Sequence, residues 1–329
     1  MATLNIMIGI PGSGNSNYAK KYLLINNSVY LSSDDIRIEL YGFEDQTHND
    51  VVFETMKKRT LNALKEGKDV IYDATNLNKK RRGGIINEAH KLDAQVDAYL
   101  CCTPINIILE RNITRAERQL PWDKLVQMIQ SIEPPMYYEG FDNIYLIDGG
   151  IYNDIYDYNF LIKECSGYNQ DNPHHYETLE EHIKAVTKKA ESLGETFYYI
   201  DAYILIQAAR YHDFGKLYTK TFNDKKNHFV YYGHDKVSAY LFMCHVRKQQ
   251  MRDSLNRVRL SNDSYKIGAL ILNHMEWYRR EDMTPIKELF NDDDLYYMLE
   301  LLHEADLWGR NEYVRMVTEF WKKIEKYKD

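Results

Sequence analysis

The sequence has no apolar run of the 18 or more residues that a membrane-spanning helix needs, and residues 1–30 show no signal-peptide pattern. We therefore expect a cytoplasmic protein with no membrane partner. Only four cysteines are present and no two form a CxxC pair, which excludes a disulfide framework and a zinc knuckle. Positive charge is not in excess either, because the net charge is −7. Any nucleic acid must therefore bind a local basic site rather than respond to the field of the whole protein.

The 329 residues are enough for two domains, and 44% hydrophobic residues can supply sizeable cores. Histidine is distributed unevenly, since nine of the eleven histidines lie after residue 170. Because imidazole is a common metal ligand, this asymmetry predicts a metal-binding second half.

The first 150 residues alternate short apolar stretches with longer amphipathic ones. The expected strands cover residues 4–9, 29–31, 69–73, 96–101 and 145–148. The expected helices cover residues 16–24, 51–66, 79–92 and 104–118. This alternation predicts an α/β domain with a parallel, doubly wound sheet, whose ligands bind beyond the carboxyl ends of the strands.

The pattern changes after residue 150. Residues 151–171 are polar and irregular, which is typical of a linker. Residues 172–329 show helical periodicity, with one short strand candidate at residues 229–232. We therefore expect a second, all-α domain.

A glycine-rich segment, GIPGSGNS at residues 9–16, lies between the first expected strand and helix. It matches the phosphate-loop pattern G-x-x-x-x-G-K-[ST] except at Asn15, where lysine is expected. The amides of such a loop cradle phosphates and the Ser16 hydroxyl would hold Mg²⁺. The other residues expected to form this cradle are Gly9, Gly12, Ser13 and Gly14. A ligand-free turn is the alternative, but the position and the run of small residues favour phosphate binding. Because Asn15 carries no charge, phosphoryl transfer should be weakened more than nucleotide binding.

Three further segments extend this pattern. SSDDIR at residues 32–37 places carboxylates after the second expected strand, where one could accept a proton from a hydroxyl. DATNLN at residues 73–78 follows the third strand. Arg111 and Arg115 are four residues apart, so on a helix they share one face and could clamp phosphates. Each segment alone is equally well explained as a cap, a turn or a solvated charge, whereas their order together favours a kinase.

With these segments and RNITR at residues 111–115, residues 1–148 resemble the 5′-kinase domain of phage-type polynucleotide kinase–phosphatases. The resemblance implies that Asp34 is the general base on a 5′-hydroxyl and that Arg37 contacts the acceptor phosphate. It makes Arg115 a lid arginine on the donor phosphates, with Arg111 as a second such contact. It also implies ATP or another NTP with Mg²⁺ as cofactors.

Histidine and aspartate recur in the second half, within or at the ends of expected helices. Candidate ligands are His182, His212, Asp213, His234, His274 and Asp306. Such groups, supplied by separate helices, can hold one or two divalent ions, either a transition metal or Mg²⁺. The alternative requires several independent core residues of these types, so we favour the metal site.

The sequences around these residues, including YHDFGK at residues 211–216 and EADLWGR at residues 304–310, are similar to HD-domain phosphohydrolases. The similarity is greatest to the HD domain of bacterial tRNA nucleotidyltransferases. It implies a first metal on His182, His212, Asp213 and Asp306. His234 and His274 would contact a second metal or the phosphate.

The same resemblance assigns Lys216 to the substrate phosphate. Arg310 would bind phosphate or form an outward salt bridge, and these two possibilities are equally weighted. His174 and His175 are assigned to a loop outside the metal set. The implied chemistry is attack of a metal-activated water on a phosphoester.

Together these features predict an RNA end-healing enzyme. One domain would phosphorylate 5′-OH ends, and the other would remove a 2′,3′-cyclic phosphate, a 2′-phosphate or a 3′-phosphate. The partners would be RNA ends, cleaved tRNA among them, and an RNA ligase. Two other hypotheses stay open. The first half could be a pseudokinase that binds nucleotide or RNA ends, or the HD domain could hydrolyse a free nucleotide with the first half as its sensor.

Overall fold

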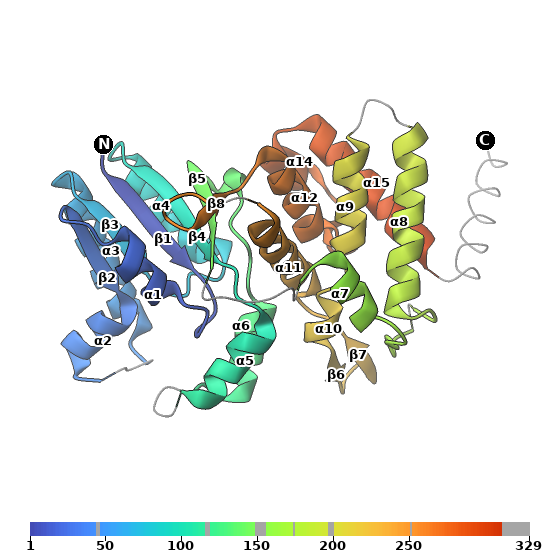
Figure 1. The fold of residues 1–329 in the computed structure, drawn as a ribbon, viewed down its shortest axis with the longest axis horizontal. Coiled ribbons are helices and arrows are strands. Elements are labelled where there is room, and N and C mark those ends of the chain that lie inside the picture. Colours follow the sequence, from blue (N-terminus) through green and yellow to red (C-terminus); the bar gives the residue numbers. More distant parts are fainter. Residues whose placement is uncertain are drawn as a thin grey trace. The chain divides into compact units, whose positions relative to one another are not determined.

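The structure is a computed structural model that describes residues 1–43, 47–115, 119–148, 156–173, 175–196, 201–250 and 252–310. The chain forms two compact units, which are described separately (Figure 1). The first comprises the described residues of Met1–Asn153 and Met243–Ser261, and the second those of Asp154–Phe242 and Asn262–Asp329. No helix in the described ranges is both long enough and apolar enough to cross a membrane.

The first unit is built on a six-stranded sheet with the order β2-β3-β1-β4-β5-β8. Its strands are β1 (Thr3–Ile8), β2 (Ser28–Ser32), β3 (Asp69–Asp73), β4 (Gln95–Cys101), β5 (Asn143–Ile147) and β8 (Arg257–Arg259). The first five run parallel, and β1 lies at the centre with Leu4 aligned to Val70 on β3 and to Val96 on β4. The α/β domain with a mostly parallel sheet, predicted from the sequence, is confirmed. Because the strands are parallel, the segments that follow β1, β2 and β3 meet at one edge.

Helices connect these strands. They are α1 (Asn15–Tyr18), the π-helical turn η1 (Ala19–Leu23), α2 (Ser33–Tyr41), α3 (Asn49–Lys65), α4 (Lys79–His90), α5 (Ile105–Thr114), α6 (Trp122–Gln130) and the 3₁₀ turn η2 (Tyr137–Glu139). Helix α3 packs on β2 and β3, and α4 packs on β4. The Ser32 side chain caps α2 by accepting hydrogen bonds from the amides of Asp34 and Asp35. This cap fixes the start of α2 directly at the end of β2, which places Asp34 at the carboxyl edge of the sheet.

The second unit is predominantly helical, although the domain predicted as all-α also contains a two-stranded sheet. Its elements are α7 (Tyr158–Glu164), α8 (Leu179–Thr196), α9 (Ala202–Tyr211), α10 (Lys216–Thr219), the strands β6 (Thr221–Asn223) and β7 (His228–Val230), the part of α11 (His234–Gln249) that ends at Phe242, α12 (Asn262–Asn273), α13 (Glu276–Arg279), α14 (Thr284–Phe290) and α15 (Asp293–Gly309). Helix α9 packs against α8, α12 and α15. Leu205 of α9 and Leu302 of α15 are fully buried and lie in this core.

Two expectations about organisation differ from the structure. Residues 151–171 were expected to form a linker, but α7 lies within them, and its Leu161 and the following Cys165 are fully buried. Residues 172–329 were expected to form one domain, but Met243–Ser261 pack with the first unit. There β8 pairs antiparallel with β5, and Val258 aligns with Leu146. Strand β8 has only three residues, and two of them are arginines, so it is too short and too polar to be predicted from the sequence.

The edge strand β8 generates a stability prediction. Val258 is 2% exposed, and an aspartate there would bury a carboxylate without a partner. We expect Val258→Asp to lower the free energy of unfolding by at least about 3 kcal/mol. Val51→Asp, at a valine that is 50% exposed on α3, should change it little. Calorimetric unfolding of both variants measures the difference, and equal stabilities would mean that β8 is not part of this core.

Candidate functional site

The first candidate site is a cavity of 880 Å³ in the first unit, where β1, β2 and β3 end. All ten residues predicted for a nucleotide and acceptor site line it, namely Gly9, Gly12, Ser13, Gly14, Asn15, Ser16, Asp34, Arg37, Arg111 and Arg115. The structure therefore brings together segments that lie up to about a hundred positions apart in the sequence.

Side chains from other segments fix the phosphate loop by donating hydrogen bonds to its carbonyl groups. The Ser13 carbonyl accepts hydrogen bonds from Thr103 Oγ1 at 2.6 Å and Cys101 Sγ at 3.0 Å. Arg111 Nη1 donates to the Gly12 carbonyl at 2.8 Å. Gly12 and Gly14 have φ angles of 92° and 109°, which only glycine adopts without strain. This left-handed backbone is typical of loops whose amides bind anions.

Asn15 occupies the interior of this loop. Its side chain accepts a hydrogen bond from Ser13 Oγ at 3.3 Å, and the residue is only 9% exposed. A Cβ added to Gly9 would lie 2.5 Å from Asn15 Oδ1, so the amide lies directly against the Gly9 backbone. The short side chain therefore bonds within the loop and brings no positive charge to the cavity.

Asp34 and Arg37 line the same cavity. Arg37 Nη1 donates to Asp34 Oδ1 at 3.0 Å, and Nη2 donates to Asn49 Oδ1 at 2.7 Å. The Arg37 guanidinium also lies 5.8 Å from the ring of Phe53. Arg37 is 4% exposed, whereas the Asp34 side chain is 46% exposed, so Arg37 orients a carboxylate that faces the cavity.

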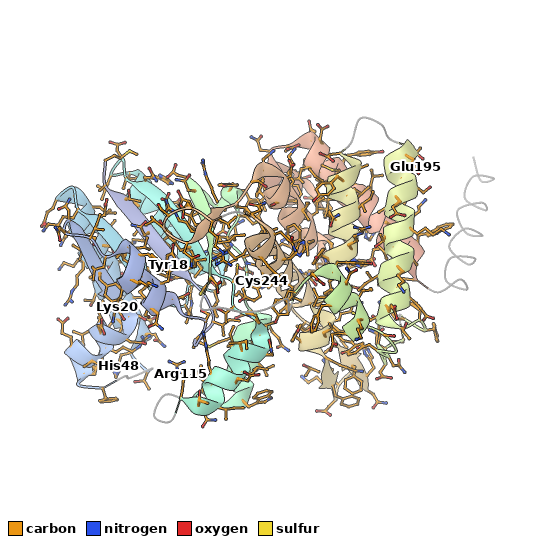
Figure 2. The ribbon with its side chains drawn as sticks, in the orientation of Figure 1. Tyr18, Lys20, His48, Arg115, Glu195 and Cys244 are labelled. Atoms are coloured by element: carbon orange, nitrogen blue, oxygen red, sulfur yellow. The ribbon has the colours of Figure 1, made fainter. Side chains whose placement is uncertain are left out.

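Arg111 and Arg115 do not share one helical face as predicted. The expected helix over residues 104–118 is α5, which ends at Thr114, and Arg115 follows in a non-helical conformation at its end (Figure 2). Both arginines still reach the cavity. The Arg111 guanidinium already donates a hydrogen bond to the Gly12 carbonyl of the loop. Arg115 is therefore the better placed of the two to bind a ligand.

The sequence prediction included Asp73 in the DATNLN segment but assigned it no role. This residue ends β3, lines the same cavity and accepts a hydrogen bond from Tyr30 Oη. Burial raises the pKa of Asp73, while hydrogen bonds from Ser16 and Tyr30 partly offset that rise. A hydroxyl and a carboxylate next to each other suit Mg²⁺, so Ser16 and Asp73 fit a nucleotide-bound magnesium ion. A strand that ends on aspartate was the signal in the sequence.

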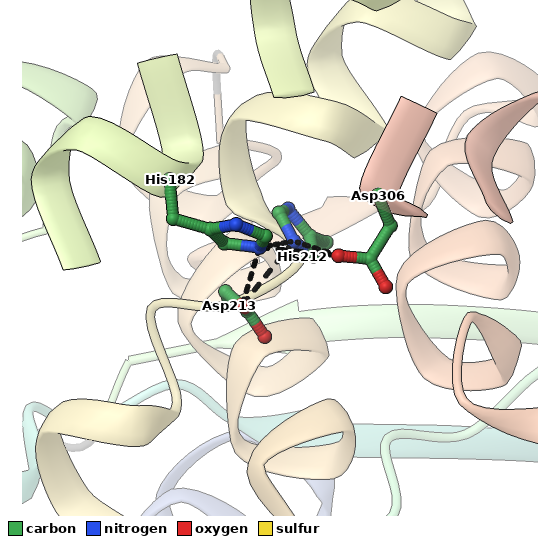
Figure 3. A group of neighbouring side chains, drawn as sticks. All are labelled: His182, His212, Asp213 and Asp306. Atoms are coloured by element: carbon green, nitrogen blue, oxygen red, sulfur yellow. Dashed lines mark hydrogen bonds and ion pairs between the residues drawn. The ribbon is translucent and has the colours of Figure 1, made fainter. Parts of the chain in front are cut away.

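The second candidate site is a buried cluster in the second unit. Figure 3 shows His182 from α8, His212 and Asp213 from the end of α9, and Asp306 from α15 converging on one point. His182 Nε2 lies 3.3 Å from His212 Nε2, 3.2 Å from Asp213 Oδ2 and 3.1 Å from Asp306 Oδ1. Ligand atoms about 2.0–2.2 Å from a tetrahedral metal are about 3.3–3.6 Å apart, so this donor set, only slightly more compact, fits a divalent metal.

The backbone sets the orientation of each imidazole. The Nδ1 atoms of His212, His234 and His274 lie 2.7–2.8 Å from the carbonyls of Ala209, Tyr231 and Ile271. A carbonyl can only accept, so each Nδ1 carries a proton, and in the neutral imidazole each Nε2 then presents a lone pair to its neighbours. This tautomer is the one that ligates a metal through Nε2.

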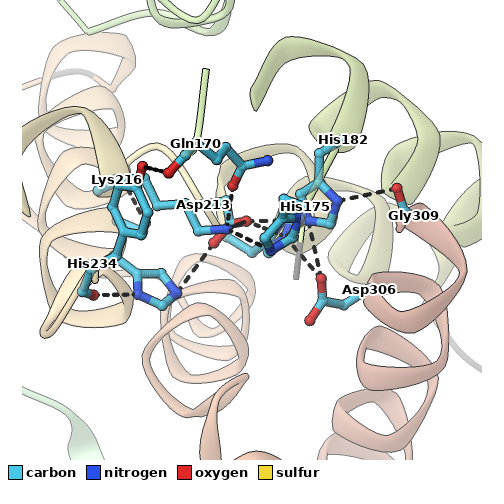
Figure 4. A network of polar contacts seen from close by, with 12 residues as sticks. Gln170, His175, His182, Asp213, Lys216, His234, Asp306 and Gly309 are labelled. Carbon is cyan, nitrogen blue, oxygen red and sulfur yellow. Dashed lines mark hydrogen bonds and ion pairs between the residues drawn. The ribbon is translucent and has the colours of Figure 1, made fainter. Parts of the chain in front are cut away.

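Asp213 joins this cluster to a second one. Its Oδ1 lies 3.2 Å from His234 Nε2, which is 3.3 Å from His274 Nε2. Asp213, His234 and His274 can therefore hold a second ion, with Asp213 shared between the two positions. Lys216, predicted to bind substrate phosphate, instead donates to Asp213 Oδ2 at 2.7 Å and to Gln170 Oε1 at 2.8 Å (Figure 4).

The buried carboxylates of the cluster are compensated by the positive charges of neighbouring side chains. Burial raises the pKa of Asp213, but Lys216 and His212 outweigh that effect and hold it well below its usual value. Burial lowers the pKa of His212, yet the carboxylates of Asp213 and Asp306 raise it to about 9. Burial and the neighbouring imidazoles lower the pKa of His274 to about 3. Divalent cations supply the charge that these carboxylates otherwise draw from protonated imidazoles.

Two contributors to this centre were missed in the sequence. Glu177 Oε1 lies 3.5 Å from His182 Nδ1 and 2.6 Å from His175 Nδ1. Tyr278 donates to Asp306 Oδ2 at 2.7 Å, and Arg310 lies over the Tyr278 ring at 4.8 Å. Neither residue belongs to a motif, because each acts by orienting a ligand. His174 lies outside the described residues.

Comparisons with known proteins agree with the geometry of the first site. Residues 4–135 match the AAA_33 family model, described as an AAA domain. The L-seryl-tRNA(Sec) kinase of Methanococcus maripaludis is 26% identical over 137 residues, which are 40% of this chain and 53% of that protein. The chain thus spans about half the length of this curated relative.

Two solved structures of the Pnkp1/Rnl/Hen1 RNA repair complex also resemble the chain. One is 23% identical, covers 37% of this chain and 42% of its own, and has a TM-score of 0.32. The other is 22% identical, covers 39% and 44%, and has a TM-score of 0.34. Residues 4–135 are thus similar to the AAA_33 family and to a kinase, and the cavity lies at the segment where the sequence predicts a phosphate site.

The buried cluster generates a metal-binding prediction. Replacing His212 or Asp213 by alanine should weaken metal binding at least about 100-fold, because each supplies a ligand atom. His228→Ala removes a half-buried imidazole outside the cluster and should leave the metal content unchanged. Elemental analysis after dialysis against Mn²⁺ or Zn²⁺ gives the answer, and full retention of metal by both ligand variants would rule this centre out.

Proposed function

We propose that this chain is a bifunctional RNA end-healing enzyme. The first unit would transfer a phosphoryl group from an NTP to a 5′-hydroxyl, and the second would be an HD-type, metal-dependent phosphohydrolase acting on a 2′,3′-cyclic, 2′- or 3′-phosphate. The observation that carries the proposal is the buried cluster. In it the Nε2 atoms of the histidines lie close to the carboxylates of Asp213 and Asp306, and Asp213 belongs to both candidate metal positions. A kinase-type cavity on the same chain supports the pairing of the two activities.

In the kinase site, the chain supplies both a donor and an acceptor side. The glycine loop would hold the phosphates of the nucleotide, with Mg²⁺ between Ser16 and Asp73. Asp34 would accept the proton of the acceptor hydroxyl while Arg37 keeps its carboxylate oriented. The relative from Methanococcus maripaludis is named as a kinase of a charged tRNA, which supports an RNA-linked hydroxyl as the acceptor.

In the hydrolase site, His182, His212, Asp213 and Asp306 would hold one divalent metal, and Asp213, His234 and His274 a second. Bound metal would supply Lewis acidity to water and phosphate. Lys216 keeps Asp213 ionised and oriented, and becomes available to the phosphate only if it leaves that carboxylate. Glu177 and Tyr278 would fix the ligand orientations.

Asn15 favours a second candidate for the first unit, a module that binds nucleotide or RNA ends without efficient transfer. The loop keeps its left-handed glycines and its braces from Thr103, Cys101 and Arg111, yet lacks the lysine charge on the β- and γ-phosphates. Binding and turnover are therefore separable in this site.

The kinase proposal is tested by restoring that charge. We expect Asn15→Lys to raise phosphorylation of 5′-OH RNA by about 100-fold or more, since one preorganised charge contact in the transition state is typically of this size. Nucleotide affinity should rise less. Adding Asp34→Ala to Asn15→Lys should remove the gain, measured as transfer of labelled γ-phosphate.

Asn17→Lys is the matched control, because Asn17 lies in α1 just after the loop and is exposed. It should give no gain. If Asn15→Lys also gives none while nucleotide still binds, the binding-module candidate replaces the kinase.

The hydrolase proposal is tested on defined 3′ ends. The protein loaded with Mn²⁺, Ni²⁺ or Zn²⁺ should open or remove a 2′,3′-cyclic phosphate from RNA, and a chelator should abolish this until metal is added back. His212→Ala should reduce hydrolysis to background. Equal chelator-resistant hydrolysis by parent and variant would exclude the metal centre as the catalyst. Activity confined to free cyclic nucleotides would instead support the nucleotide hydrolase.

A further inference from the structure

A short hairpin interrupts the helical second unit between two residues of the metal centre. Strands β6 and β7 pair antiparallel, with Phe222 opposite Phe229. The hairpin follows α10, which begins with Lys216, and it leads into α11, which begins with His234. An isolated two-stranded hairpin is marginally stable in water, so its contacts with the rest of the unit decide its position.

The hairpin is anchored directly beside the metal centre. Tyr231 donates from Oη to the Gln170 carbonyl at 2.5 Å, and its ring lies 5.7 Å from Lys216 Nζ. Lys220 pairs with Asp171 at 2.6 Å and lies over the Phe229 ring. Because Gln170 and Lys216 both contact the network around Asp213, the root of the hairpin forms part of the wall of that network (Figure 4).

The rest of the hairpin is unusually aromatic and basic for an exposed element. Phe222 is 47% exposed and Tyr232 is 59% exposed. The turn carries Lys225 and Lys226, both exposed, and neither has an ion-pair partner within the described parts of the chain. Lys226 lies over the Tyr232 ring at 5.7 Å. Residues 217–232 thus carry three lysines against one aspartate, in a chain whose net charge is −7.

We propose that the β6–β7 hairpin is the docking surface for the single-stranded RNA whose terminal phosphate enters the metal centre. The inference rests on the proposed hydrolase function and narrows its substrate to a polynucleotide. Bases would stack on Phe222 and Tyr232, and the backbone phosphates would pair with Lys225 and Lys226. Aromatic faces combined with unpaired lysines suit single-stranded nucleic acid, which offers both flat bases and regularly spaced negative charge.

A protein partner is less well matched to this surface. Protein interfaces are depleted in lysine and have an apolar centre with the charges at the rim. Here Lys225 and Lys226 lie in the turn, and Lys226 lies over the ring of the exposed Tyr232. A free nucleotide would need only the centre itself and would make no use of the tip.

The experiment compares two substrates across two pairs of substitutions in the full-length, metal-loaded protein. The substrates are an oligoribonucleotide of about ten nucleotides with a 2′,3′-cyclic phosphate end and the corresponding mononucleoside 2′,3′-cyclic phosphate. The hairpin variant is Phe222→Ala with Tyr232→Ala. The control variant is Tyr203→Ala with Lys188→Ala. Tyr203 is also 59% exposed but lies at the start of α9, whereas His212 follows its end, and Lys188 is exposed on α8.

We expect the hairpin variant to raise KM for the oligonucleotide at least about tenfold, with kcat and the mononucleotide kinetics unchanged. Lys225→Ala with Lys226→Ala should raise the same KM and flatten its dependence on salt. The control variant should match the parent on both substrates. Equal losses on both substrates, or no change on the oligonucleotide, would overturn the inference.

A binding readout separates this inference from the hydrolase proposal. A photoreactive oligonucleotide should crosslink to peptides within residues 221–232 of the metal-loaded protein. Crosslinks there without hydrolysis would retain the docking surface and refute the hydrolase, whereas hydrolysis of RNA without crosslinks there would refute the docking surface. Capture of a protein on the hairpin with no RNA crosslinks would also refute it.

Discussion

The second unit is organised around the burial of one carboxylate. Asp213 is 2% exposed, and an ionised carboxylate that deep is stable only if every direction around it offers a compensating charge or donor. His182 and His212 approach Oδ2, His234 approaches Oδ1, and Lys216 donates to Oδ2. These partners come from α8, the end of α9, α10 and α11. The packing of these helices therefore determines the geometry of the centre. The close approach of α10 to α11 shows this, because a Cβ on Gly215 would lie 2.0 Å from the His234 carbonyl.

The first unit shows a different relation between architecture and chemistry. Its phosphate loop is shaped by contacts beneath it, where the Ser13 carbonyl accepts from Thr103 and Cys101 and the Gly12 carbonyl accepts from Arg111. None of these contacts involves the side chain at position 15. The loop can therefore keep its form with Asn15 in place of lysine, while the charge needed for transfer is missing. The conformation of the phosphate loop and the charge needed for transfer depend on different residues, so the charge can be lost while the conformation is kept.

Many residues of the candidate sites could be predicted from local sequence, because they lie at the ends of strands and helices. Strand β3 lies at the predicted residues 69–73, and the polar segments after β1 and β2 meet at one cavity because parallel strands end at one edge. The features that were missed depend on distant contacts. Glu177 and Tyr278 matter only through the ligands that they touch, and β8 is a strand only because β5 offers a free edge. Helix α7 was hidden in a largely polar stretch, although Leu161 and Cys165 there are fully buried. Lys216 was predicted to bind substrate phosphate, and the spacing could not reveal that it donates to Asp213 in this structure.

The most direct test of this account is the position of a bound metal. A crystal grown with Mn²⁺ and examined at the manganese absorption edge should show an anomalous peak in the second unit within about 2.0–2.3 Å of His182 Nε2, His212 Nε2 and the facing oxygens of Asp213 and Asp306. A second, weaker peak between Asp213, His234 and His274 would agree with the shared carboxylate. Well-ordered density for these side chains with no peak among them, in a crystal that holds manganese elsewhere, would contradict the account.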